Sequence, residues 1–349
     1  MELTKCKLGE LITQRREKND GSDLPICGVS KDGLIPPKQK DADTSIYNVF
    51  YRDDFIFNPA RMELNSIAIN DMYDRAICSS LYEVFYVHRT DLLLPHYLKL
   101  IIRQKWFTRY CKFLGQGSAR EYCRFGNISE IEIEFPPIKE QQKIVDYNIA
   151  IENRIALKQK INDNLANQAL ALFSDFVSQL NKELEQRKLG DVIASANTGG
   201  DAIQKVPIVD YDTGIKCARV GDITNAREYA SWAFCNASKS VYDNYKLQAG
   251  DILVTRTATL GITQYISKDI SAVYNNGLIR LKVNDTNALP LYIYWAMKTS
   301  DFLNYINQMN SATSVRPNMK IDYLLNYQLS IPSIEEQTQF TNAVEPLMN

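Results

Sequence analysis

The longest regular pattern of hydrophobic and polar positions lies between Ile138 and Lys188, a stretch without glycine or proline. Hydrophobic residues recur there at steps of mostly four and seven positions, which places them in one narrow seam along a helix. The seam consists of Ile144, Ile151, Ile155, Ile161, Leu165, Leu172, Phe176 and Leu180. The other positions are mainly polar or charged, so the opposite face should be exposed. At 1.5 Å per residue this helix would span roughly 75 Å, which suits a coiled-coil-forming spacer between two domains.

The sequences on either side of this helix repeat each other at low identity. Residues 7–12 (KLGELI) return as 188–193 (KLGDVI), and residues 53–57 (DDFIF) return as 250–254 (GDILV). Further on, 94–98 (LPHYL) match 289–293 (LPLYI), and 136–141 (PPIKEQ) match 332–337 (PSIEEQ). From Asp54 onward the offset stays between 195 and 197 residues, whereas the first pair is offset by 181. The pattern indicates a duplicated domain whose second copy has a longer early segment.

Each copy has the pattern of an α+β domain. Short β-rich runs come first, at 48–57, 66–69 and 81–87 in one copy and at 251–255, 261–266 and 277–283 in the other. A helix with a proline in its first turn follows, at Pro95 or Pro290. A last strand, 131–135 or 326–331, leads into the next helix. We therefore predict domains at 1–137 and 188–333, a central helix at 138–187, and the start of a second, truncated helix at 334–349.

The two helix starts at 136–141 and 332–337 have a structural explanation. Ser333 and Glu336 have the spacing of a capping box, and Pro137 suits an early helical turn. The recurrence predicts a second helix that would pair antiparallel with the first. Only residues 334–349 are available for it, and Pro346 interrupts them. The seam from Ile161 to Leu180 should then lack a partner within the chain, which implies a partner protein, self-association or a shortened gene product.

Composition narrows the class of protein. No run of about twenty hydrophobic residues is present, so we expect no membrane span, and no apolar signal region follows the N-terminal charges. The seven cysteines are scattered, none forms a Cys-x-x-Cys pair, and only His88 and His96 could add imidazole ligands. We therefore expect free thiols in a reducing cytoplasm and no metal site. The formal net charge is −1, so any nucleic-acid binding must come from local clusters of Lys and Arg.

No pattern of catalytic residues is present. The sequence contains neither a Gly-x-x-x-x-Gly-Lys-Ser/Thr loop nor a Gly-x-Gly-x-x-Gly motif, so nucleotide binding by those routes is not supported. Residues 58–61 (NPAR) match half of the Asn-Pro-Pro-aromatic motif of adenine methyltransferases but lack its second proline and its aromatic residue. We expect no catalytic residue.

A basic and aromatic segment is present in the first copy. Residues 99–124 contain seven basic residues against one acid, interleaved with aromatic residues. One interpretation is a solvated basic helix whose aromatic residues face the core. The loop 117–124 (GSAREYCR) is the better candidate for binding, because it is basic and polar and suits hydrogen bonds to phosphates and base edges.

The second copy has polar loops at corresponding places, namely 255–259 (TRTAT), 275–277 (NNG) and 310–320 (NSATSVRPNMK). Arg and Asn side chains have the bidentate geometry that fits guanine and adenine edges. Our candidate DNA-binding residues are Arg61, Arg120, Tyr122 and Arg124 in the first copy and Arg256, Asn275, Asn276, Arg316, Asn318 and Lys320 in the second.

The whole chain resembles the specificity (S) subunit of type I restriction–modification enzymes. The resemblance rests on the twin helix starts, on KLG[ED] before each copy, on 250–256 (GDILVTR) and on 310–318 (NSATSVRPN). It implies two target-recognition domains that each read half of a bipartite site in double-stranded DNA. It further implies modification (M) subunits that grip the helices and bring S-adenosylmethionine, and restriction (R) subunits that cleave. The chain itself would carry no cofactor.

The short C-terminal segment departs from the family pattern, which has a second long helix there. A homodimer through the unpaired seam is therefore one expectation. Two other functions remain open: a scaffold protein that assembles partners through its long helix and binds no DNA, and an enzyme that both reads and modifies DNA in one chain. The missing cofactor loop argues against the latter.

Overall fold

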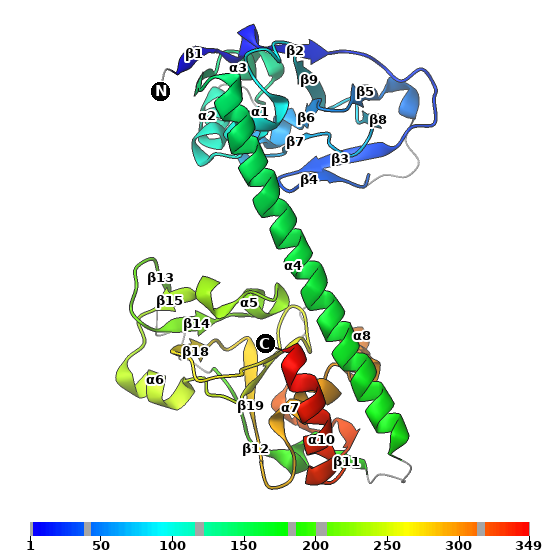
Figure 1. The fold of residues 1–349 in the computed structure, drawn as a ribbon, viewed down its shortest axis with the longest axis vertical. Coiled ribbons are helices and arrows are strands. Elements are labelled where there is room, and N and C mark those ends of the chain that lie inside the picture. The colour runs from blue at the N-terminus through cyan, green and yellow to red at the C-terminus, as the bar shows by residue number, and fades with distance from the viewer. Residues whose placement is uncertain are drawn as a thin grey trace. The chain divides into compact units, whose positions relative to one another are not determined.

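The computed structural model describes residues 3–37, 43–115, 122–180, 186–199, 208–312 and 318–348. The chain divides into two compact units, Met1–Leu157 and Lys158–Asn349, and helix α4 (Ile138–Gln179) contributes to both (Figure 1). Each unit is a mixed α+β domain, as the sequence predicts. None of the helices described is long and apolar enough to cross a membrane.

The first unit contains two sheets with mixed strand order. One has the order β2 (Ile12–Arg15), β9 (Glu83–Val87), β6 (Phe55–Phe57) and β7 (Ile67–Ile69), and its neighbours are antiparallel. The other has the order β4 (Gly33–Ile35), β3 (Ile26–Ser30), β8 (Arg75–Cys78) and β5 (Asn48–Tyr51), with β3 and β8 parallel. A further antiparallel pair joins β1 (Thr4–Lys7) to β10 (Glu132–Phe135). The helices are α1 (Pro95–Ile102), α2 (Lys105–Gly115) and α3 (Phe125–Ser129), with a 3-10 helix, η3, at Pro59–Leu64.

The second unit repeats this plan. Its antiparallel sheet has the order β12 (Ile193–Thr198), β19 (Leu278–Val283), β16 (Ile252–Thr255) and β17 (Thr263–Tyr265). The other sheet has the order β13 (Ile208–Val209), β15 (Ala233–Cys235), β14 (Lys216–Ala218) and β18 (Ala272–Tyr274), with β14 and β18 parallel. Strand β11 (Gln186–Lys188) pairs with β20 (Gln328–Ser330). The helices are α5 (Val220–Thr224), α6 (Lys239–Tyr245), α7 (Pro290–Ala296), α8 (Ser300–Ala312), α9 (Ile321–Leu325) and α10 (Ile334–Val344).

The predicted β-run at 48–57 is two strands rather than one. Asp53 has a φ of 65°, and the amide of Asp54 bonds the carbonyl of Tyr51 at 3.1 Å, so the chain turns sharply between β5 and β6. Each strand then enters a different sheet. The sequence does mark this turn, because the charged residues 52–54 (RDD) separate two short hydrophobic runs, and treating 48–57 as one β-run passed over that break.

A buried carboxylate closes this turn in both units. The amide of Tyr51 donates to Oδ2 of Asp54 at 2.8 Å, and the amide of Gln248 donates to Oδ2 of Asp251 at 2.9 Å. Arg15 pairs with Asp54 in the first unit. Burial raises the pKa of both carboxyl groups, and the hydrogen bonds and the nearby cations oppose that rise. The sequence pattern did not predict that these two carboxylates are buried and close the turn.

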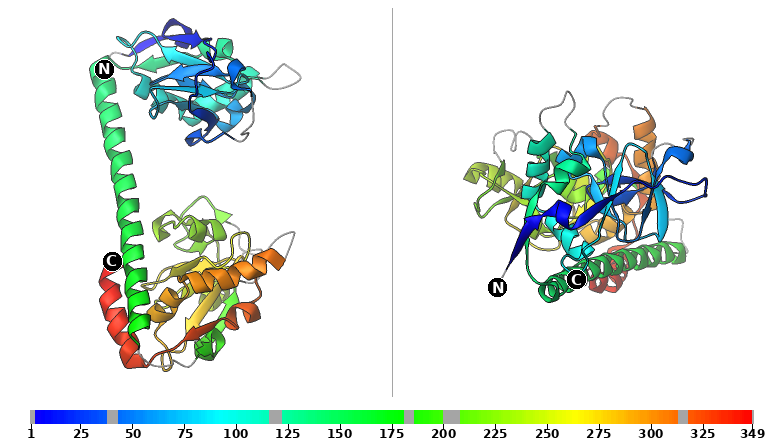
Figure 2. Two further views of the ribbon diagram at one scale, coloured as in Figure 1. Left: turned by 90° about the vertical axis from the view of Figure 1, so that its right-hand side faces the viewer. Right: turned by 90° about the horizontal axis from the view of Figure 1, so that it is seen from above.

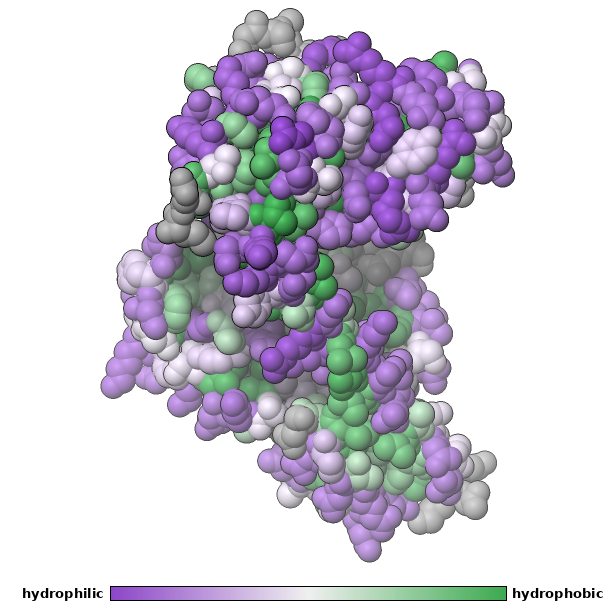
Figure 3. All heavy atoms as spheres, turned by 45° about the horizontal axis from the view of Figure 1, so that its top comes forward, coloured by the Kyte–Doolittle hydropathy of each residue, from purple (hydrophilic) through white to green (hydrophobic). Residues whose placement is uncertain are grey.

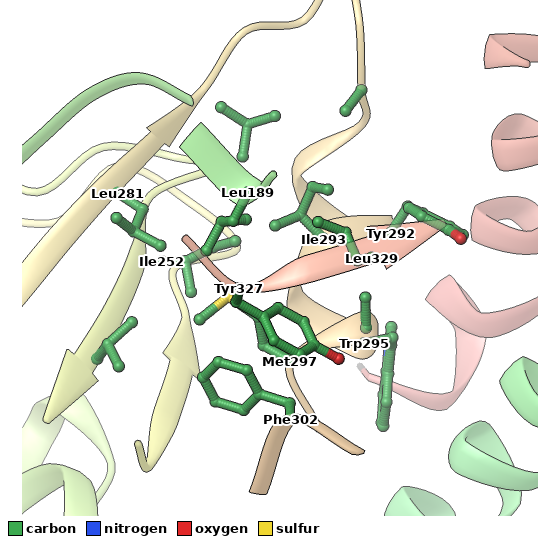
Figure 4. Close-up of a cluster of buried hydrophobic side chains, with 14 of the residues drawn as sticks. Leu189, Ile252, Leu281, Tyr292, Ile293, Trp295, Met297, Phe302, Tyr327 and Leu329 are labelled. Carbon is green, nitrogen blue, oxygen red and sulfur yellow. The ribbon is translucent and has the colours of Figure 1, made fainter. Parts of the chain in front are cut away.

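The core of the second unit lies between its antiparallel sheet and α7 to α10. Leu189, Ile252, Ile293 and Phe302 converge there from four different elements, and Tyr327 joins them from the segment between α9 and β20 (Figure 4). Phe302 and Tyr327 meet edge to face with ring centroids 5.0 Å apart. In the first unit, Phe107 takes the position of Phe302 in an equivalent cluster.

One glutamine fixes the helix start of each unit. Gln141 is fully buried; its Oε1 accepts from the amide of Leu94 at 2.9 Å, and its Nε2 donates to the carbonyl oxygens of Leu92 and Pro136. Gln337 makes the matching bonds to the amide of Leu289 and the carbonyl of Pro332. The predicted capping box of Ser333 and Glu336 is confirmed. Capping is only part of the role of the residues at 136–141 and 332–337, because the glutamine also bonds the helix to the start of α1 or α7.

Helix α4 is shorter than the predicted 138–187. It ends at Gln179, and Gln186–Lys188 form β11 instead. The reason is that β11 pairs with β20 through Gln186–Ser330, Arg187–Leu329 and Lys188–Gln328, which fixes an extended backbone where the side chains alone favour a helix.

The buried face of α4 is not the predicted seam. Val145 is buried in the first unit, and Ala169 and Phe173 are buried in the second. Every position from 149 to 164 is exposed, including the seam residues Ile151, Ile155 and Ile161. On the face drawn in Figure 3, hydrophobic residues form separate patches within a mostly hydrophilic surface.

Helix α10 packs against the end of α4 and runs antiparallel to it (Figures 1 and 2). The ring of Phe340 lies 5.2 Å from that of Phe173 and 5.5 Å from that of Phe176. The expectation that the seam from Ile161 to Leu180 has no partner in the chain is therefore wrong at Phe176, because α10 is long enough to cover it. Leu172 is still exposed.

Candidate nucleic-acid interface

In the second unit, three distant segments meet around Arg256, the residue after β16. Its backbone amide donates to the carbonyl of Gly277 at 2.9 Å, and its carbonyl accepts from the amide of Met319 at 2.8 Å. Thr257 and Asn318 form an isolated antiparallel bridge beside this contact. The structure thus brings together the predicted residues Arg256, Asn275, Asn276 and Asn318, which are up to 62 positions apart in the sequence.

The guanidinium of Arg256 holds these segments to each other. Its Nε donates to the carbonyl of Met319 at 3.1 Å, and its Nη1 donates to Oδ1 of Asn276 at 3.1 Å. Among the described residues, Nη2 has no hydrogen-bond partner. Arg256 therefore acts as a clamp between these segments and is not a freely presented bidentate fork.

The turn of Asn275, Asn276 and Gly277 depends on its glycine. Oδ1 of Asn275 accepts from the amide of Gly277 at 3.0 Å, and the amide of Asn275 donates to the carbonyl of Ala218. A Cβ at Gly277 would lie 2.4 Å from Cγ2 of Val220, so no other residue fits without a shift. Asn276 is exposed next to this fixed turn, and Arg256 orients its amide.

Lys320 lies two residues beyond the bridge, at the N-terminal end of α9. Its side chain is exposed, and the described residues provide it with no ion-pair partner. Arg316 lies outside the described residues. A free cation beside a fixed amide cluster suits a phosphate contact.

In the first unit, Arg61 lies in η3, directly after β6. Asn58 caps this element by accepting from the amide of Ala60 at 3.1 Å, and a φ of −138° at Arg61 interrupts its helical geometry. Arg61 is exposed, and no described residue pairs with its guanidinium. It lines a groove of about 730 Å³ together with Lys31, Tyr47 and Tyr82. Those three residues were not among the sequence candidates, because each lies in a run with no cluster of similar residues.

Tyr122 and Arg124 lie beside each other before α3. The guanidinium of Arg124 lies 5.4 Å from the centre of the Tyr122 ring, a cation–π distance. Its Nη1 is also 3.5 Å from Oε1 of Glu83, whose other oxygen accepts from the amide of Phe125 at 2.7 Å. Glu83 thus balances part of the charge of Arg124. Arg120 lies outside the described residues.

The two candidate clusters occupy the same position of the duplicated fold. The amide of Cys123 donates to the carbonyl of Pro59 at 3.0 Å, which matches the bond from Met319 to Arg256. Tyr122 therefore corresponds to Asn318, and Arg124 corresponds to Lys320. The main chain is shared, whereas the side chains that it presents differ between the units.

The described residues contain no group of three His, Cys, Asp or Glu side chains that could hold a metal ion. The seven cysteines are free thiols, and six of them are buried. Burial raises the pKa of Cys27 to about 11, which keeps this thiol protonated at neutral pH.

Comparison with known proteins identifies a family that matches most of the chain. A family model described as the type I restriction modification DNA specificity domain matches residues 6–167 and 181–349. The MjaIX specificity subunit of Methanocaldococcus jannaschii is 29% identical over 163 residues, which cover 39% of this chain and 38% of that protein. The HindI specificity subunit of Haemophilus influenzae is 27% identical over 88 residues, covering 25% of this chain and 19% of that protein. The chain thus matches less than half the length of each of these relatives.

The fold also has a solved counterpart. The crystal structure of a type I restriction–modification S subunit from M. genitalium aligns with 99% of this chain and 89% of its own length. The TM-score is 0.59 at 14% sequence identity. The likeness concerns the fold.

Proposed function

We propose that this chain, which belongs to the type I restriction–modification DNA specificity family, is the subunit that reads the target sequence of such a system. Each unit would contact one half of a bipartite site in double-stranded DNA. The chain would perform no catalysis, and its thiols would stay reduced in the cytoplasm.

The observation that carries this proposal is that the candidate cluster around Arg256 and the one around Tyr122 and Arg124 lie at the same position of a duplicated fold. Two domains that recognise different DNA sequences need the same backbone position for their contact residues but different side chains there. In this comparison Arg256 corresponds to Pro59 and Asn318 to Tyr122, so the side chains differ there, whereas Lys320 and Arg124 are both cations. Amide and guanidinium groups supply base-edge contacts, and lysine supplies phosphate contacts.

We assign the second half-site to Arg256, Asn275, Asn276, Asn318 and Lys320, with Asn276 as the main base reader. Its amide is exposed and is oriented by Arg256. We assign the first half-site to Arg61, Tyr122 and Arg124. Arg120 and Arg316 remain candidates that lie outside the described residues.

The exposed positions of α4 are proposed to bind the partner subunits. These would be M subunits, which bring S-adenosylmethionine and transfer the methyl group, and R subunits, which cleave. The predicted seam residues Ile144, Ile151, Ile155, Ile161 and Leu165 would lie in that contact, with Leu172 nearer the end of the helix. Phe176 packs on Phe340 and Leu180 follows the helix, so these two seam residues would lie at its margin. Association of two copies through the seam is the alternative use of the same face.

The test is to assemble the chain with its M subunits and S-adenosylmethionine and to identify the methylated motif by sequencing. Asn276→Ala should relax one position of one half-site, by about 1–3 kcal/mol if the amide contacts a base. Lys320→Ala should weaken binding to all sequences and lower the salt dependence. Lys268→Ala, an exposed lysine on another loop of the same unit, is the matched control and should change neither.

Several outcomes would contradict the proposal. A uniform loss for Asn276→Ala would move that residue to the phosphate contacts. A complex that forms through α4 but protects no DNA would favour the scaffold function instead. Methyl transfer by the isolated chain would favour an enzyme that reads and modifies DNA by itself.

A further inference from the structure

Helix α2 carries a row of exposed aromatic side chains on the outside of the first unit. Trp106 is 41% exposed, Tyr110 is 40% exposed and Phe113 is 65% exposed. They are four and three positions apart and therefore share one side of the helix. Phe107 and Cys111 supply the side that faces the core. We call Trp106, Tyr110 and Phe113 the aromatic ridge.

The rings of the ridge are held in place on the surface. Tyr110 and Phe113 stack with centroids 6.2 Å apart, and Nε1 of Trp106 donates to Oε1 of Gln104 at 2.6 Å. Large side chains at positions i, i+4 and i+7 are typical of a helix that inserts into a groove of another protein. Trp and Tyr are also the residues that most often dominate such contacts.

The charge on α2 indicates what kind of surface would receive the ridge. Lys105, Arg109 and Lys112 are exposed beside the ridge, and the helix Lys105–Gly115 contains no Asp or Glu. A complementary surface should therefore combine a hydrophobic floor with acidic residues.

The same unit presents a surface of that kind. A hollow of about 390 Å³ is lined by Tyr97 and Ile101 on α1, by Trp106 itself, and by Glu132 and Glu134 on β10. Lys5 pairs with Glu132 at 3.1 Å, whereas Glu134 has no salt bridge among the described residues. Basic and acidic surfaces thus lie side by side around exposed rings, which makes the patch complementary to itself.

We propose that two copies of this chain associate through these faces, with the ridge of each copy in the acid-lined hollow of the other. A self-complementary patch of this kind generates a two-fold contact, in which every interaction occurs twice. Arg109 and Lys112 of each copy would then lie near Glu132 and Glu134 of the other. This contact is separate from the seam on α4 and does not depend on DNA binding.

The second unit lacks the corresponding ridge, which limits the association to two copies. Helix α8 has Asp301, Tyr305 and Gln308 at the three positions and contains no Lys or Arg. Tyr305 is not available, because it stacks on Tyr323 at 4.7 Å and the two residues exchange hydrogen bonds from hydroxyl to carbonyl. One patch per chain produces a closed dimer rather than a filament.

The test uses opposite charge reversals in the full chain. One variant carries Arg109→Glu and Lys112→Glu, and the other carries Glu132→Lys and Glu134→Lys. Mass is measured by light scattering at a series of protein concentrations. The unaltered chain should reach twice 39.9 kDa, and each variant alone should stay at 39.9 kDa. An equimolar mixture of the two variants should recover the dimer, because both contacts of the mixed pair are again between opposite charges.

Tryptophan fluorescence gives a second readout. Of the three tryptophans, Trp232 and Trp295 are only 2% and 4% exposed, so a change on association reports on Trp106. The emission of the unaltered chain should shift to shorter wavelength as concentration rises, and the shift should vanish in Trp106→Phe. Lys239→Glu with Lys268→Glu, two exposed lysines of the second unit, is the matched control and should leave the dimer intact.

Four results would overturn the proposal. The first is a monomer at all concentrations up to about 100 μM. The second is a dimer that survives both reversals and is lost on Ile151→Glu, because the α4 seam would then be the contact. The third is a mixture of the two variants that stays monomeric while hydrogen exchange shows both to be folded. If the α2 reversal instead removes a salt-dependent affinity for DNA from a monomeric chain, the ridge is a nucleic-acid contact and the dimer contact is refuted.

Discussion

Helices α2 and α8 hold the same position in the two units, yet their outer sides differ. Both bury a phenylalanine, Phe107 or Phe302, at the same distance from the preceding proline of α1 or α7. Outside, α2 presents exposed rings and three cations, whereas α8 presents Asp301, Asn and Gln. The buried side of a duplicated element is constrained by packing, while its exposed side is free to acquire a separate partner in each copy.

The largest expected effect concerns that shared buried side. Phe107→Ala and Phe302→Ala should each destabilise their own unit by about 4 kcal/mol, because a large cavity replaces the ring. Hydrogen exchange read separately for the two units should localise each loss. Leu303→Ala, on an exposed position of α8, is the control and should change little. Equal losses in both units from either variant would show that the units do not unfold independently.

A smaller loss of stability is expected at the equivalent buried glutamines, Gln141 in the first unit and Gln337 in the second. Gln141→Leu should destabilise the first unit by about 2 kcal/mol, since the amide of Leu94 and two carbonyls lose their partners. Gln337→Leu should cost the second unit a similar amount. Urea unfolding followed by exchange would measure both. Gln142→Leu changes an exposed neighbour that bonds Asp146 on the same helix and should be neutral. A loss of stability there would mean that helix propensity decides the result.

The two candidate arginines, Arg256 and Arg61, should differ in how much they stabilise their units, and both effects should be smaller than those of the glutamines. Arg256→Ala should destabilise the second unit by about 1 kcal/mol, because the bonds to Met319 and Asn276 disappear. Arg61→Ala should leave the stability of the first unit within about 0.5 kcal/mol, since no described residue bonds its guanidinium. Thermal unfolding measures both, with Arg89→Ala, which pairs only with Asp91, as the control. A stable Arg256→Ala variant would refute its role as a clamp.

The smallest effect is expected at the surface ion pair between Lys7 of β1 and Glu130, which follows α3. Glu130→Gln removes the ion pair between Glu130 and Lys7, whose side chains are both more than half exposed, and should lower the stability only slightly. The loss should disappear at 1 M salt, where such charges are screened. A loss that persists at high salt would mean that the Lys7–Glu130 contact stabilises the strand pair by other means.

The sequence predicted only some of the parts of the fold that repeat, since β8 and β18 are equivalent strands that it did not predict. The proline-led helices, the last strand of each unit and the start of α4 all lie where the offset of 195 to 197 placed them. The strands before Asn48 were not predicted, because β2, β3 and β4 are short and lie where the offset between the copies changes. The end of α4 was wrong because strand pairing at Gln186–Lys188 is a long-range effect.

The candidate site could be predicted only as a set of residue types. Gly277 and the Asn pair carry a turn signal, so their place at a loop tip follows from the sequence. The hydrogen bonds of Arg256 to Met319 and Asn276 could not be predicted from the sequence. The bond to Met319, for example, joins positions 63 residues apart. The aromatic residues of α2 divide between core and surface, which a count of aromatic residues cannot show: Phe107 is buried, whereas Phe113 is exposed.

The uninterrupted exposure of residues 149–164 has a consequence for how α4 responds to heat and proteases. Contacts to other elements are few in this stretch, such as the ion pairs of Glu152 with Lys99 at 3.9 Å and with Arg103 at 3.8 Å, so its backbone amides are protected mainly by the helix's own hydrogen bonds. A segment of this length is marginal by itself in water and persists because buried residues, Val145 and Ala169, fix the helix on either side. Its middle should therefore be the first part of the helix to fray and be cleaved, and a binding partner that covers it would make it the most strongly protected.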